Sequence, residues 1–172
     1  MRPQTGDPRV APTGSEGTGG GGSCLVLGLG NDILTDDRVG LAVVRRLREL
    51  VGDAAAIAEA PFAGPDLISL VTGYERLIIV DAVWGAGHQP GTILHGTADD
   101  PPPGLGYRSP HSMALAELLA AGRELGLEMP TEVTIHAVAV DDPFRFGEEM
   151  TAAVAEAAER LAQSLRECLR PM

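Results

Sequence analysis

At 172 residues the chain is long enough for one domain with a substantial core, and its net charge of −11, without Lys or Arg clusters, argues against nucleic-acid binding. Only 3% of the residues are aromatic, so we expect a core of Leu, Val, Ile and Ala. The two cysteines lie far apart, no segment approaches membrane-spanning length, and no signal peptide is evident. These features predict a reduced, cytoplasmic protein with no membrane partner.

The chain divides into a tail and one folded domain. Residues 1–22 are rich in Gly, Pro, Thr and Ser, which favours a disordered N-terminal tail, and the domain is expected over residues 23–172. Within the domain, strand and helix patterns alternate. We expect strands at 24–27, 54–60, 77–80, 92–95 and 131–140, and helices at 37–50, 64–72, 109–125 and along the C-terminal segment that carries Val154, Ala158, Leu161, Leu165 and Cys168 on one face.

This alternation predicts an α/β fold. We expect a single three-layer domain in which a twisted, mainly parallel sheet of about five strands is sandwiched by helices. The segment 77–80 is apolar on both faces, as expected of a central strand that helices cover on each side.

A glycine motif follows the first strand. Gly28-x-Gly30 matches the start of a dinucleotide-binding fingerprint, but the position of its third glycine is occupied by Ile33. Carboxylates at Asp36 and Asp37 would also repel a pyrophosphate. A nucleotide-binding module is therefore a weak alternative, and the simpler reading is that the glycines turn the chain tightly.

Acidic residues mark two of the expected strand and helix ends. Asp36 and Asp37 open the first helix, where the helix dipole and free N–H groups favour carboxylates even without a function. Asp81 directly follows four apolar residues at the expected end of a central strand. A carboxylate there needs compensation for its desolvation, which loop N–H groups, a metal ion or a catalytic role would supply.

A histidine completes a candidate metal site. His111 follows Ser109 and Pro110 at the start of a helix, where the dipole disfavours imidazolium and leaves a neutral ring able to bind metal. The alternative is an exposed histidine that happens to begin a helix. Asp37, Asp81 and His111 would meet at the carboxyl edge of the sheet and suit a divalent ion such as Ni²⁺ or Zn²⁺. By contrast, His136 inside the last strand is expected to be a packed, hydrogen-bonded residue rather than a metal ligand.

Three segments, in this order and spacing, resemble one known family. They are LGLGNDILTDDRVG (27–40), VDAVWGAGHQPGTI (80–93) and SPHSMALAELL (109–119), and they resemble the hydrogenase maturation endopeptidases. The resemblance covers nearly the whole domain and implies a twisted sheet between helices. It also implies an endopeptidase that removes the C-terminal extension of a nickel-loaded [NiFe] hydrogenase large-subunit precursor.

The resemblance also assigns the site. Position by position, the metal-binding and catalytic triad of the family falls on Asp37, Asp81 and His111. The nickel is supplied by the substrate, so the large-subunit precursor is the implied partner, and Zn or Cd is an implied substitute in a crystal. Whether Asp37 or Asp81 is the general base is left open.

The chain departs from the family pattern at three places. The first ligand is commonly Glu, and Asp37 is shorter by one C–C bond, about 1.5 Å. An Asp-Gly-Gly motif after the second strand is replaced by Glu59-Ala60-Pro61, and the segment 141–149 matches only loosely. These departures keep an alternative open: a maturation chaperone of the same fold that binds nickel or the precursor without cleaving it.

Overall fold

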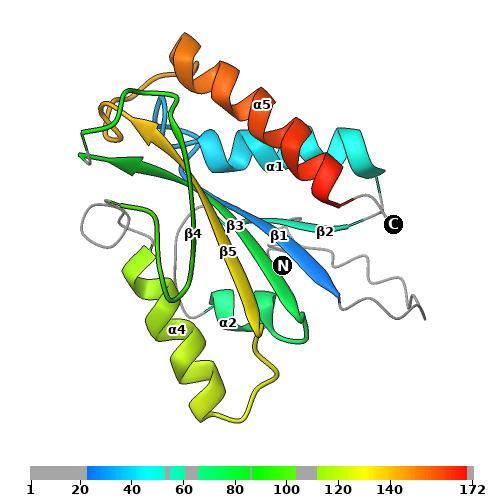
Figure 1. Ribbon diagram of the computed structural model, residues 1–172. Helices are drawn as coiled ribbons and strands as arrows, with labels where there is room; N and C mark the ends of the chain where they lie inside the picture. The colour runs from blue at the N-terminus through cyan, green and yellow to red at the C-terminus, as the bar shows by residue number, and fades with distance from the viewer. Residues whose placement is uncertain (1–22, 53–54, 61–65, 86, 104–111, 170–172) are drawn as a thin grey trace, which may run out of the picture.

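The computed structural model describes residues 23–52, 55–60, 66–85, 87–103 and 112–169 (Figure 1). The elements in chain order are β1 (Cys24–Leu29), α1 (Val39–Val51), β2 (Ala56–Ala60), α2 (Asp66–Val71), β3 (Arg76–Trp84), β4 (Ile93–Thr97), α4 (Ser112–Glu124), β5 (Glu132–Val140) and α5 (Ala152–Cys168). The strands form one sheet in the order β2-β1-β3-β5-β4, in which only β4 runs antiparallel to its neighbour. The predicted α/β architecture is confirmed.

Helices cover both faces of the sheet. Helices α1 and α5 lie on one face and α2 and α4 on the other (Figure 1). Along β3, Leu77 and Ile79 pack toward α2 and α4, whereas Ile78 and Val80 pack toward α1 and α5. The expected central strand is therefore apolar on both faces because each face has its own core.

Several expected boundaries differ from the structure, and two of them bear on the candidate site; one expected position was also wrong. The predicted first helix at 37–50 begins instead at Val39, so Asp37 precedes it. Strand β3 does not end at Asp81 but continues to Trp84, because β5 pairs with it as far as the last register pair, Trp84 with Val140. Cys168 is exposed and does not belong to the buried stripe of α5.

Some expectations fall outside the described residues. The disordered tail at 1–22 and the helix start at 109–111 belong to this group. In the part of the chain that the structure does describe, no helix combines the length and the apolar character needed to cross a bilayer.

Two glycines let α1 approach the sheet closely. A Cβ atom at Gly40 would clash with the carbonyl oxygens of Leu29 and Val80, and one at Gly28 would clash with the carbonyl oxygen of Gly40. A side chain at either position would push the helix outward. The start of α1 is thus held against the carboxyl end of β1 and the middle of β3, which is where the candidate site lies.

Candidate functional site

Asp81 lies inside β3, just beyond the point where the neighbouring strand β1 stops pairing with it. The pairing of β1 with β3 ends at Val80, while β5 continues alongside and pairs Asp81 with Ala137. The residue is 1% exposed, and its Oδ1 accepts a hydrogen bond from the N–H of Ala82 at 2.8 Å. Because side chains alternate along a strand, Asp81 points to the face of α2 and α4. Its carboxyl group is buried at the carboxyl end of β1.

Asp37 lies against the same end of β1. It is 4% exposed and precedes α1 by one residue, Arg38. The backbone carbonyl of Asp37 is so close to Gly30 that a Cβ atom there would clash with it. Gly30 directly follows β1, and β1 is the neighbour of β3, which carries Asp81. Both predicted aspartates are therefore buried where β1 ends.

Asp36 has a structural partner. Its Oδ1 accepts a hydrogen bond from the N–H of Thr151 at 2.8 Å, and its Oδ2 accepts one from the Thr151 hydroxyl at 3.0 Å. Thr151 is the residue before α5, so the carboxylate lies at the N-terminus of α5 and not in the first turn of α1. A carboxylate there is favoured by unpaired N–H groups and by the helix dipole.

Arg38 is a contributor to this region that sequence reasoning missed. Its guanidinium donates to the carbonyl oxygens of Leu34 at 3.0 Å, Gly147 at 2.6 Å and Glu148 at 2.5 Å, and also to that of Asp32. One planar cation thus joins the loop before α1 to the loop before α5. Only its place next to Asp37 hinted at a role, because all its partners are backbone groups and two of them, Gly147 and Glu148, are more than a hundred residues away.

The two loops also share backbone contacts. The N–H of Thr35 donates a hydrogen bond to the backbone carbonyl oxygen of Arg145 at 2.7 Å. Leu34 and Phe146 form an isolated antiparallel β-bridge. The segment 141–149, which matches the family pattern only loosely in sequence, therefore supports the loop that carries Asp37.

An ion-pair network borders this loop on the outer side of α1. Arg45 contacts Asp32 and Glu59, each at 2.7 Å, and Arg48 contacts Glu59 at 3.0 Å. The hydrogen bond from Arg45 lowers the pKa of Asp32, and its two carboxylate partners raise the pKa of Arg45. Glu59, which stands in the segment that replaces the family's Asp-Gly-Gly, is thus paired with two arginines.

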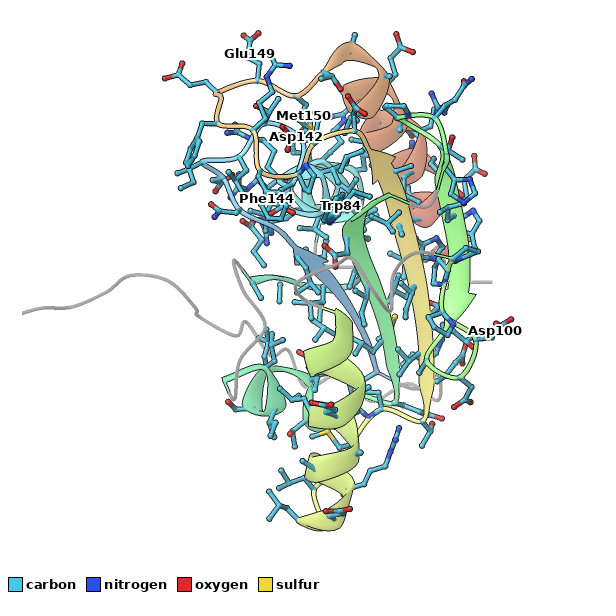
Figure 2. All side chains as sticks on the ribbon, turned by 90° about the vertical axis from the view of Figure 1, so that its left-hand side faces the viewer. Trp84, Asp100, Asp142, Phe144, Glu149 and Met150 are labelled. Atoms are coloured by element: carbon cyan, nitrogen blue, oxygen red, sulfur yellow. The ribbon has the colours of Figure 1, made fainter. Side chains whose placement is uncertain are left out.

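Apolar side chains are exposed on the same two loops. Ile33, Phe144 and Phe146 are 60%, 57% and 75% exposed. The Phe144 ring packs edge-on against Trp84 at the end of β3, with ring centroids 5.6 Å apart (Figure 2). This surface lies beside the buried aspartates and offers apolar contacts to a binding partner.

His111 lies outside the described residues. The direction in which α4 runs still shows on which side of the sheet this helix begins. After α4, the carbonyl of Glu128 accepts a hydrogen bond from Gly73 N–H at 2.8 Å, so the C-terminal end of α4 leads to the amino end of β3. The N-terminal end of α4 therefore lies toward the carboxyl edge of the sheet, and α4 covers the face to which Asp81 turns (Figure 1). Among the described residues, no three His, Cys, Asp or Glu side chains form a metal-binding group.

Comparisons with known proteins agree on one family. The sequence model of a family described as hydrogenase maturation protease matches residues 41–167, a range that includes Asp81 and His111 but begins after Asp37. The hydrogenase 2 maturation protease of Escherichia coli strain K12 is 36% identical over 115 residues, which cover 64% of this chain and 69% of that protein.

Solved structures show the same fold. The hydrogenase maturating endopeptidase HybD from E. coli is similar with a TM-score of 0.73 and 28% identity, over 86% of this chain and 92% of that one. The [NiFe] hydrogenase maturation protease HybD from Thermococcus kodakarensis has a TM-score of 0.66 at 23% identity, over 86% and 99%, and supports the fold alone.

Proposed function

Because this chain belongs to the hydrogenase maturation protease family, we propose that it removes the C-terminal extension of a [NiFe] hydrogenase large-subunit precursor. Members of the family are peptidases, and the chain is accordingly a hydrolase that acts on peptide bonds. The finer points of the proposal are the substrate segment, the role of nickel and the residues that act.

The observation that carries the proposal is the burial of two carboxyl groups at one end of β1. Asp37 and Asp81 are 4% and 1% exposed. Ligands bind at the carboxyl ends of the strands in α/β sheets, so two carboxyl groups buried together at this place favour a functional site. We assign Asp37, Asp81 and His111 as the residues that recognise the nickel carried by the precursor.

In this mechanism the three side chains hold the metal centre of the substrate. Two carboxylates and one neutral imidazole leave coordination positions open, and a bound divalent metal can polarise a carbonyl or lower the pKa of a water molecule. Contact with the metal places the peptide bond that follows the nickel-binding segment beside Asp37 and Asp81. One of these carboxylates accepts a proton from the attacking water.

The shorter side chain of Asp37 is compatible with this role. Because Gly40 allows α1 to touch the carbonyl groups of Leu29 and Val80, the backbone of Asp37 is already in contact with the end of β1. A side chain that starts so close needs less reach than one on a helix held farther away.

The test is to mix the purified chain with its cognate precursor, with and without nickel, and to determine the mass of the product. Loss of one defined C-terminal peptide only from the nickel-loaded precursor is the expected result. Formation of a stable nickel-dependent complex without any mass change would contradict cleavage and indicate a maturation chaperone. Cleavage of the nickel-free precursor at the same rate would contradict the role of the metal.

A further inference from the structure

Two histidines face each other across the antiparallel pair of β4 and β5, and one of them lies on the strand next to Asp81. His95 and His136 are register partners, and their Nδ1 atoms are 2.8 Å apart. Their ring centroids are 4.8 Å apart with the planes at 86°. The prediction of a packed, hydrogen-bonded His136 is confirmed, and its partner is a second imidazole.

The pair lies on the opposite face from Asp81. His95 alternates with Leu94, and His136 alternates with Ile135 and Ala137, all three of which pack toward α2 and α4. The two imidazoles therefore belong to the face of α1 and α5. The ring of His95 is exposed at the edge of this face, so small ions from solvent have access to it.

The separation of the two nitrogens fits a metal ion. Metal–imidazole bonds are about 2.0–2.1 Å long, so two nitrogens in adjacent positions of a square-planar or octahedral complex lie about 2.9 Å apart. In a tetrahedral complex they lie about 3.3 Å apart. We propose that His95 and His136 form a binding site for a divalent transition-metal ion, Cu²⁺ or Ni²⁺, through their Nδ1 atoms.

The hydrogen bond between the two rings is compatible with metal binding. In the metal-free pair one Nδ1–H donates to the other Nδ1. Metal binding needs both Nδ1 lone pairs, and the proton of the donating ring moves to its own Nε2, so no net proton is released.

The ligand set also predicts the properties of the site. Since no third His, Cys, Asp or Glu joins the pair among the described residues, water completes the coordination sphere. Binding will be weaker than at a four-ligand structural zinc site, and Cu²⁺ will bind more tightly than Ni²⁺ or Zn²⁺. Because β4 is an edge strand, a metal ion that joins it to β5 will raise the thermal unfolding midpoint.

The test is calorimetric titration of the full chain with CuCl₂ and NiCl₂. The variants His95→Ala and His95→Asn remove one ligand, and His88→Ala removes an exposed histidine of the loop before β4 as the matched control. We expect affinity to fall by about tenfold or more in both His95 variants and to stay unchanged in His88→Ala. Electron paramagnetic resonance of the Cu²⁺ complex should show two equivalent imidazole nitrogens.

Metal titration of the variants Asp81→Asn and His111→Ala distinguishes binding at the histidine pair from binding at the proposed triad. Binding that survives both substitutions but is lost in His95→Ala supports the pair. Wild-type affinity in a folded His95→Ala protein, or a Cu²⁺ spectrum with a single nitrogen, would overturn it. Because the readout is metal binding and not peptide cleavage, this result is independent of the proposed endopeptidase activity.

Discussion

At the scale of single residues, the adjacent aspartates Asp36 and Asp37 lie in different surroundings. Asp36 is committed to the backbone and hydroxyl of Thr151, whereas Asp37 is buried against the end of β1. Asp81 is buried in a strand that continues past it. Sequence position alone does not show which of two adjacent aspartates caps a distant helix, because both lie next to the start of α1.

Replacing Asp81 tests the proposed chemistry. The substitution Asp81→Asn keeps the oxygen that accepts the Ala82 N–H but removes the charge. We expect precursor cleavage to slow by about 100-fold or more, as for loss of a general base or charged ligand, with no loss of thermal stability. The measurement is the single-turnover cleavage rate beside a melting curve, with Asp99→Asn as an exposed control. A cleavage rate equal to wild type would remove Asp81 from the site.

Arg38 is expected to be needed for loop order. In Arg38→Ala the carbonyl groups of two loops lose a charged donor, and we expect a loss of about 1–3 kcal/mol in the free energy of unfolding. Lysine at this position should recover little, because one ammonium cannot replace the planar fork. Denaturant unfolding measures the loss, and Arg145→Ala, an exposed change in the same region, should be nearly neutral. An equal loss of unfolding free energy in both variants would argue against a specific role of the Arg38 hydrogen bonds.

At the scale of elements, the geometry of the site depends on how closely α1 approaches the sheet. The helix touches backbone carbonyl groups of β1 and β3 through Gly40, and α5 packs beside it on the same face. The loop that carries Asp37 is then fixed at one end by α1 and at the other by the segment before α5. The site is therefore made by contacts between elements and not by one motif.

The substitution Gly40→Ala distinguishes the effect of helix packing on stability from the effect of helix propensity, because the two have opposite signs. Alanine in a helix is favoured over glycine by about 1 kcal/mol, so propensity alone predicts stabilisation. Because the added Cβ would meet the carbonyl groups of Leu29 and Val80, we expect destabilisation by about 1–3 kcal/mol and slower cleavage. Denaturant unfolding gives the sign, and a stabilised variant would contradict the close approach.

At the scale of the whole molecule, ion pairs connect α1 to its surroundings. Arg45 joins the loop at Asp32 to β2, and Arg46 joins α1 to Glu159 of α5 at 2.9 Å. Hydrogen bonds from these arginines lower the pKa of Asp32 and of Glu159. All four side chains are partly exposed, so each pair contributes modestly and is screened by salt.

These pairs predict a dependence of stability on pH. A carboxyl group whose pKa is lower in the folded protein stabilises it above the unfolded pKa, about 3.9 for Asp and 4.3 for Glu. That contribution is lost as the pH falls through the folded pKa. We expect Arg45→Gln and Arg46→Gln to lower the melting temperature at pH 7 and to match wild type near pH 2. Differences that persist unchanged at acid pH would exclude the ion pairs as their cause.

The sequence by itself determined the architecture and the family. Apolar patterning of period two or 3.6 is a local property, so the alternation of strands and helices and the doubly covered strand β3 could be predicted. The three resembling segments pointed to the hydrogenase maturation proteases, and the family match covers most of the chain. Asp81 could be selected because a carboxylate after an apolar run is costly without compensation, whereas Asp37 was selected through the family resemblance.

Only the tertiary structure decided how these residues are used. It extended β3 past Asp81, because pairing with β5 gives the strand its last hydrogen bonds. It also assigned Asp36 to α5 and joined Arg38 to a loop more than a hundred residues away. The His95–His136 pair depends in the same way on the register of β4 against β5. Each of these contacts joins distant parts of the chain, and a pattern within a short window of sequence carries no information about such pairings.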